Sequence, residues 1–141
     1  MAICFNTKRR IEFAETDMAG IAHFSSFFRY MEEVEHAYFR SLGISVVHEQ
    51  GDIQLSWPRV SAECEFFKPI RFEDVVDVEL ELLRRGKTSL TFGVTFLLDD
   101  QKMASGRLVT ACCSVKCGKL RAKPIPTWLV ELLADSDEKD A

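Results

Sequence analysis

The stretch "RIEFAETDMAGIAHFSSFFRYMEEVEHAYFRSLG", residues 10–43, decides how the chain folds. From Phe24 onward its apolar side chains recur every three or four residues, which is the period of one helix face. Gly43 follows at a position that favours the end of a helix. The spacing predicts a helix of about five turns over residues 24–42. Asp17 lies just before this helix in a short loop of small and apolar residues, where a carboxylate needs an explanation.

Beyond the helix the apolar period changes to two, which predicts strands. The segment "VVDVELELL", residues 75–83, alternates apolar and acidic side chains, and Leu90 to Phe96 repeats the pattern after a tight turn at Gly86-Lys87. Asp99-Asp100 make the next turn, and Pro58 predicts an edge strand or a bulge. The remaining predictions are strands over residues 3–13, 54–67 and 101–117 and a short helix from Pro126. The order of elements predicts an α+β fold, an antiparallel sheet around a single central helix.

Composition favours one soluble domain that spans residues 1–141, with a tail from about residue 135 that is expected to be flexible. The apolar runs are too short to cross a membrane, and the first residues do not resemble a secretory signal, so a cytoplasmic protein is expected. The net charge of −4 argues against nucleic-acid binding. Five cysteines without a paired CxxC spacing indicate reduced thiols and no metal site.

The loop and helix together resemble the hotdog-fold thioesterases, in particular the 4-hydroxybenzoyl-CoA thioesterase-like family. The family pattern is an aromatic residue, an acid, an aspartate, a glycine and an aliphatic residue ahead of an aromatic-rich helix, and here these are Phe13, Glu15, Asp17, Gly20 and Ile21. The similarity continues through residues 66–92 and covers about residues 8–125. It implies a five-stranded antiparallel sheet wrapped around one long helix.

The resemblance also implies an activity, hydrolysis of an aryl- or acyl-CoA thioester to free acid and coenzyme A. Asp17 would act as nucleophile or as general base, and the residues leave both roles open. Backbone N–H groups around His23 and Phe24, at the positive end of the helix, would polarise the thioester carbonyl, while Gly20 would let the loop approach closely. Coenzyme A is part of the substrate, so no separate cofactor is expected. Without the resemblance, Asp17 is an acid that stabilises a helix N-terminus by about 0.3–1 kcal/mol.

Two departures from the family pattern keep alternatives open. His23 stands where close relatives carry a bulky aromatic residue, and Phe24 stands where Tyr or His is frequent. Hotdog hydratases and dehydratases use an acid and a histidine a few residues apart, but "DMAGIAH" lacks the asparagine and the spacing of their motif. A non-catalytic acyl-CoA-binding protein is the third hypothesis. His23 alone is interpreted as a packing or hydrogen-bonding residue at the helix start.

The nucleotide of coenzyme A requires cations, and Arg84, Arg85 and Lys87 cluster at a predicted hairpin, as in the hydroxybenzoyl enzymes. A second basic set follows the last strand, at Lys116, Lys119, Arg121 and Lys123. The resemblance places the acyl pocket between two subunits of a homodimer or homotetramer. Its candidate residues are Glu32, Trp57 and Ser61.

The other ionisable residues near the motif are expected to lie in solvent. Glu15 is interpreted as a solvated residue at a strand end, and His36 and His48 as surface residues. Glu33 and Glu35, like Glu32, are expected to be solvated or interfacial. Acyl specificity, dimer versus tetramer and the pathway are left open.

Overall fold

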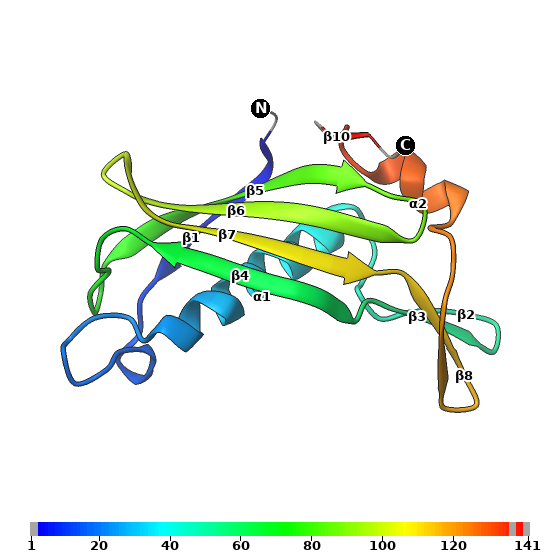
Figure 1. Cartoon of the computed structure of the whole chain (residues 1–141), viewed down its shortest axis with the longest axis horizontal. Helices are drawn as coiled ribbons and strands as arrows, with labels where there is room; N and C mark the ends of the chain where they lie inside the picture. Colours follow the sequence, from blue (N-terminus) through cyan, green and yellow to red (C-terminus); the bar gives the residue numbers. More distant parts are fainter. Residues whose placement is uncertain (1–2, 136–137, 140–141) are drawn as a thin grey trace.

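The computed structural model describes residues 3–135 and 138–139, and its centre is one antiparallel sheet with a long helix packed across one face (Figure 1). The helix is α1, Phe24–Ser41. In spatial order the strands are β1 (Ile3–Arg10), β5 (Val75–Arg85), β6 (Ser89–Leu98), β7 (Gln101–Ala111) and β4 (Arg59–Phe66). The α+β arrangement expected from the sequence is thus observed.

Helix α1 and the sheet face each other through side chains that the sequence pattern marked as apolar. The buried face of α1 includes Phe27, Met31 and Val34, and it packs on the inward residues of β5 and β6. Gly106 on β7 allows the close approach, because a Cβ atom there would overlap the sulfur of Met31. The helix ends at Ser41, and Gly43 just beyond it has a φ of +82°, the left-handed conformation that glycine adopts readily.

The predicted turns of the sheet are confirmed. Asp99 and Asp100, both with positive φ, join β6 to β7, and the N–H of Gly86 donates to the carbonyl of Ser89 at 2.8 Å in the turn between β5 and β6. Pro58 immediately precedes β4, an edge strand whose pairing with β7 shifts register at its first residues. The edge or bulge expected there is observed.

A second, smaller sheet was not expected, and it corrects the prediction of one five-stranded sheet. It pairs β2 (His48–Gln50), β3 (Ile53–Ser56), β8 (Cys113–Lys116) and β9 (Lys119–Ala122). The predicted strands over residues 54–67 and 101–117 are each divided in two, because the chain passes from one sheet to the other at Pro58 and at Cys112. The N–H of Cys112 donates to the Thr88 carbonyl at 2.7 Å.

The ends of the chain differ from expectation as well. The first strand stops at Arg10 and is followed by the short 3-10 helix η1, Phe13–Glu15. The terminal helix is α2, Thr127–Leu132, so α1 is not the only α-helix. Of the tail, Glu138–Lys139 form β10, which pairs in parallel with Arg84 and Arg85 as a sixth strand of the main sheet, while the rest from residue 136 lies outside the described residues.

The two ends of the main sheet carry different features. The segment from β1 to α1, with Asp17, lies at one end, beside the start of β5 (left in Figure 1). The turn from β5 to β6 lies at the opposite end, near α2. Among the described helices, neither is both long and apolar enough to cross a membrane.

Candidate active site

The Asp17 segment is a closed loop. The N–H of Asp17 donates to the Ile21 carbonyl at 2.9 Å, Thr16 and Ala22 form a β-bridge, and the N–H of Ala22 donates to the Ile70 carbonyl at 2.7 Å. Gly20 has a φ of +80°, and among the described residues, apart from Gly20 and its two neighbours, no atom lies within 4 Å of the place where a Cβ would stand. The turn itself therefore requires the glycine, and close approach of a ligand to Gly20 stays a prediction.

The two oxygens of the Asp17 carboxylate have different surroundings. Oδ1 accepts the N–H groups of Ala19 at 2.8 Å and Ile21 at 3.4 Å, which holds the side chain within its own loop. Among the described residues, Oδ2 receives no hydrogen bond. The residue is half-buried, so one oxygen is fixed by the loop and the other is available to a reacting group.

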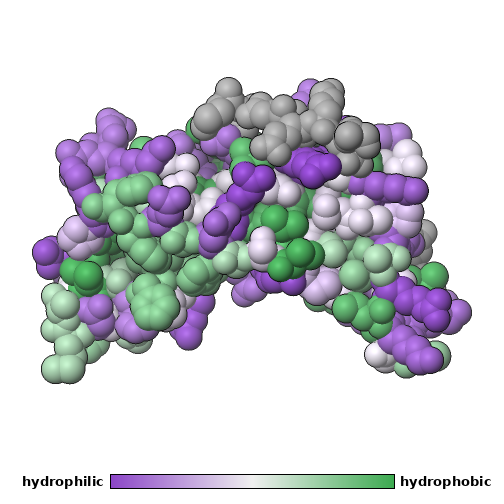
Figure 2. All heavy atoms as spheres, in the orientation of Figure 1, coloured by the Kyte–Doolittle hydropathy of each residue, from purple (hydrophilic) through white to green (hydrophobic). Residues whose placement is uncertain are grey.

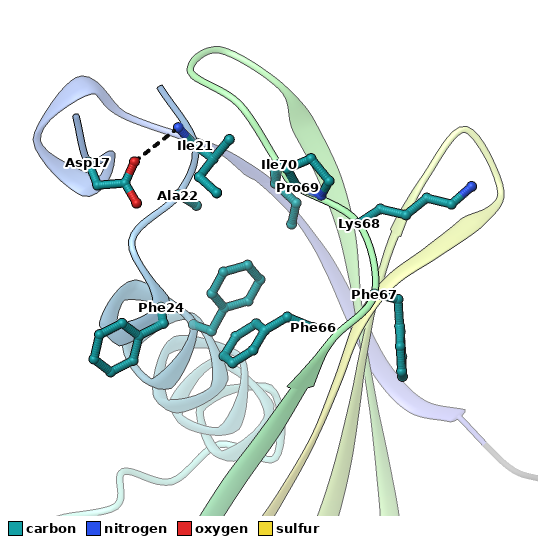
Figure 3. A pocket seen from close by; sticks show the side chains of 10 residues that line it. Asp17, Ile21, Ala22, Phe24, Phe66, Phe67, Lys68, Pro69 and Ile70 are labelled. Carbon is teal, nitrogen blue, oxygen red and sulfur yellow. Dashed lines mark hydrogen bonds between the residues drawn. The ribbon is translucent and has the colours of Figure 1, made fainter. Parts of the chain in front are cut away.

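This carboxylate lines an apolar cavity of about 430 Å³ between the start of α1 and the end of β4 (Figure 3). The rings of Phe24, Phe27 and Phe66 line this cavity. The amine of Lys68 points away from Asp17 in Figure 3 and donates to Gln101 at 3.1 Å. Besides Asp17, the lining residues are Ile21, Ala22, Phe24, Phe27, Phe66, Phe67, Lys68, Pro69 and Ile70.

Asp17 also lines a second cavity, of about 470 Å³. Its walls are Phe13 and Phe72, whose rings meet edge to face with centroids 5.7 Å apart. Both rings are exposed, as are Met18 and Phe24. The candidate carboxylate therefore sits on an unusually apolar surface.

The N-terminus of α1 provides fewer free donors than the sequence suggested. His23 is the N-cap residue, and its Nδ1 accepts the N–H of Ser25 at 3.2 Å, which confirms a hydrogen-bonding role. The backbone N–H of His23, however, donates to the Glu15 carbonyl at 2.8 Å. Within the described residues the N–H of Phe24, the first helical residue, has no acceptor. Of the two expected backbone donors, only Phe24 is free.

Glu15 is not the solvated residue that the sequence suggested. Its side chain is 13% exposed and is bound by Arg9, by Tyr30 and by the N–H of Glu12. Burial acts to raise the pKa of Glu15, but the hydrogen bonds from these three donors and the charge of Arg9 hold it below its ordinary value. The sequence contains no local signal for this pairing, because Arg9 belongs to the preceding strand.

The candidate acyl-pocket residues do not meet Asp17 within one chain. Glu32 and Trp57 line a different cavity, of about 270 Å³, at the start of β4, while Ser61 is exposed on that strand and lines neither. Arg59, at the start of β4, lies seven positions before Phe66, which corresponds to about 23 Å along the strand. The predicted pocket is therefore split between two places on one subunit.

Glu35, expected to be solvated or interfacial, lines this smaller cavity and is 1% exposed. Its Oε2 accepts from Arg59 at 2.8 Å, and its Oε1 has no hydrogen-bond donor; Nε2 of His36 stands 3.6 Å away. His36 and His48, interpreted from the sequence as surface residues, are half-buried. The rings of His48 and Trp128 lie with centroids 4.9 Å apart and are tilted by 46°.

The expected coenzyme-binding cations lie at the far end of the sheet from Asp17. Arg84 and Arg85 end β5, ten residues from its start beside the Asp17 loop, which corresponds to about 30 Å along the strand. Lys87 follows in the turn. The second basic set is on β8, β9 and the segment after them. Lys68, which the sequence reasoning missed, is the cation that lines the Asp17 cavity.

No three His, Cys, Asp or Glu side chains among the described residues are placed to hold a metal ion. That the protein works without a metal stays a prediction.

The comparisons with known proteins identify the family. The sequence model of the Thioesterase superfamily matches residues 19–105, more than half of the chain, so the protein belongs to this superfamily. The match begins after Asp17 and does not itself cover that residue. A 1,4-dihydroxy-2-naphthoyl-CoA hydrolase of Prochlorococcus marinus (strain NATL2A) is 25% identical over 135 residues, which are 88% of this chain and 86% of that protein.

Solved structures agree in fold. A hypothetical protein from Aquifex aeolicus is 31% identical, with a TM-score of 0.78 over 92% of this chain and 99% of that one. The 4-hydroxybenzoyl-CoA thioesterase from Pseudomonas sp. strain CBS-3 superposes with a TM-score of 0.80 over 94% of this chain and 100% of that one, at 20% identity. The hotdog thioesterase fold is confirmed, and superfamily membership identifies the chain as a thioester hydrolase.

Proposed function

We propose that the protein hydrolyses an aryl- or acyl-CoA thioester to free acid and coenzyme A, with Asp17 supplying the reactive carboxylate. The observation that carries the proposal is the position of Asp17 Oδ2, which has no hydrogen bond among the described residues and faces an apolar cavity beside the start of α1. An acyl chain fits an apolar cavity, and a free carboxylate at its edge reaches the thioester carbon.

Two routes are open to this carboxylate. It can attack the acyl carbon, expel the thiolate of coenzyme A and form a mixed anhydride that water then hydrolyses. It can instead take a proton from a water molecule whose oxygen attacks the acyl carbon. In both routes the carbonyl oxygen gains negative charge. The free N–H of Phe24, at the positive end of α1, stabilises that charge. Neither route needs a cofactor.

The complete site is proposed to form between two subunits. Strand β4 is an edge of the main sheet, and most of its side chains are exposed, Val60 and Phe66 among them. Figure 2 shows apolar side chains at the end that carries the Asp17 loop and a hollow between that end and the second sheet. An exposed edge of this kind is usually paired or covered.

Antiparallel pairing of β4 with its own copy would follow a two-fold axis. It would bring the Arg59 end of one strand beside the Phe66 end of the other. The cavity with Glu32 and Trp57 and the exposed Ser61 would then approach the partner's reactive carboxylate. Pairing across the sheet would also move the basic turn at Arg84, Arg85 and Lys87 towards that carboxylate, where it would bind the nucleotide phosphates of the substrate. A homodimer suffices for this arrangement, and a homotetramer would pair two of them. A cytoplasmic location is part of the same proposal.

The experiment is thiol release from a panel of benzoyl-, hydroxybenzoyl- and fatty acyl-CoA esters, with the thiol and the free acid both quantified. Equal amounts of acid and thiol from at least one ester support the proposal and name the acyl group. Enoyl esters that gain water while the thioester stays intact, with activity lost in His23→Ala, would indicate a hydratase. Binding of the esters without any turnover would indicate an acyl-CoA-binding protein.

A further inference from the structure

The side chain of Glu15, two residues before Asp17, accepts four hydrogen bonds. Its Oε1 accepts from Arg9 Nη1 at 3.0 Å, from the Tyr30 hydroxyl at 2.9 Å and from the Glu12 N–H at 2.8 Å. Its Oε2 accepts from Arg9 Nη2. Arg9 is on β1 and Tyr30 is on α1, so a single carboxylate links the strand before the loop to the helix after it.

The backbone of Glu15 makes a second link to the same helix. Its carbonyl accepts the N–H of His23 at 2.8 Å and the hydroxyl of Ser26 at 2.9 Å. His23 is the N-cap of α1 and Ser26 is buried in its first turn. The first turn of the helix is thereby docked directly on residue 15, two positions before Asp17.

We infer that Glu15 is a positioning residue for the thioesterase reaction, which holds the Asp17 carboxylate and the N–H of Phe24 at a fixed separation. The inference rests on the proposed function, because it assumes that Asp17 and this N–H act on the same thioester. Glu15 lines neither cavity beside Asp17, so it acts through the loop and not on the substrate.

The side chain is the part that a substitution can test, since the carbonyl contacts remain. Glutamine at position 15 keeps one acceptor oxygen for Tyr30 and Glu12, but it presents an amide to Arg9 in place of a carboxylate oxygen. Arg9 then loses half of its bidentate pairing, which weakens the link between the loop and β1. Misplacement of a reacting group by about 1 Å costs up to about 10²-fold in rate.

The test compares kcat and KM of Glu15→Gln with those of a matched control, Glu33→Gln. Glu33 also pairs with Arg9, at 2.8 Å, but it is half exposed and does not touch the loop. We expect kcat of Glu15→Gln to fall at least about tenfold with KM within about twofold, and Glu33→Gln to stay within about twofold of wild type. Tyr30→Phe removes one donor of Glu15 and should lower kcat by a few-fold, which keeps the inference testable if Glu15→Gln does not fold.

Combining Glu15→Gln with Asp17→Asn distinguishes the positioning role of Glu15 from a purely structural role. If Glu15 acts through Asp17, adding Glu15→Gln to Asp17→Asn leaves the residual kcat of Asp17→Asn unchanged. Equal fold losses in both backgrounds would overturn the inference, as would a KM that rises together with a normal kcat. If the residual rate of Asp17→Asn is too low to measure, the split between kcat and KM in the single variants decides.

Failure of the inference and failure of the proposed function give different results. Wild-type kcat in Glu15→Gln, with activity lost in Asp17→Asn, would remove Glu15 alone. Wild-type kcat in Asp17→Asn would remove the proposed reactive carboxylate, whatever Glu15 does.

Discussion

Replacing Arg59 by methionine should strongly destabilise the protein, because it leaves a buried carboxylate without its cation. Glu35 is 1% exposed, and the 2.8 Å contact with Arg59 Nη1 is its one hydrogen bond among the described residues. His36 Nε2, at 3.6 Å, is too distant to replace that bond. The variant tests whether the Arg59–Glu35 pair holds β4 to α1.

The magnitude follows from the burial of the two partners. Removing one member of a buried ion pair costs about 3–5 kcal/mol. Because the Arg59 side chain is 28% exposed, solvent weakens the pair and the lower end, about 3 kcal/mol, is expected. For a chain of this size, about 3 °C per kcal/mol then gives a fall in Tm of about 9 °C.

The assay is thermal unfolding followed by circular dichroism at constant protein concentration. The matched control is Arg29→Met, an exposed arginine on the same helix as Glu35, which should change stability by no more than about 0.5 kcal/mol. The double variant Arg59→Met with Glu35→Leu should recover most of the loss, since it removes the stranded charge. A Tm of Arg59→Met close to wild type, or a double variant no better than the single one, would refute the reasoning.

Four further predictions concern packing, thiol chemistry and the coenzyme. Gly106→Ala forces the Met31 side chain to move, so we expect the unfolding free energy measured by urea titration to fall by about 1–3 kcal/mol. An unchanged urea midpoint would contradict the close contact between α1 and the sheet. Burial raises the pKa of Cys4, Cys64 and Cys112 to about 11. At pH 8 only about 0.1% of each of these thiols is thiolate, so iodoacetamide should modify the exposed Cys117 first, as peptide mapping can check. The unfolding free energy should also fall as the pH rises from the ordinary thiol pKa towards 11, because the unfolded chain loses these protons first. Arg84→Ala with Arg85→Ala should raise KM for CoA esters more than for short thioesters without the nucleotide, and an equal rise for both would point to general destabilisation.

The helix and the hairpins were predictable because their signals are local. The three-and-four spacing from Phe27 to Tyr38 specifies one buried face of a helix whatever lies against it. The turn at Asp99-Asp100 is specified by two residues that tolerate positive φ between alternating strands. The Asp17 loop was recognised through its resemblance to a family, and its hydrogen bonds could not be read from spacing.

The burial of charged residues could not be predicted in the same way. Glu15 is half-buried and Glu35 is buried, and each depends on an arginine from another element for its compensating charge. These arginines are Arg9 on β1 and Arg59 on β4. The second sheet was missed for a similar reason. The strand over residues 101–117 breaks at Cys112 through a hydrogen bond to Thr88, and the alternation of its side chains gives no sign of that contact.

The Asp17→Asn variant tests the central claim most directly. Asparagine keeps an oxygen for the N–H groups of Ala19 and Ile21, so the loop is retained while the free carboxylate oxygen is replaced by an amide. The control is Asp52→Asn, an exposed carboxylate in the turn between β2 and β3. The measurement is kcat for thiol release from whichever CoA ester the wild type hydrolyses. A loss of at least about 10²-fold in Asp17→Asn, with a normal fold and normal Asp52→Asn, is predicted. A kcat within a few-fold of wild type in folded Asp17→Asn would contradict the assignment of Asp17 as the reactive carboxylate.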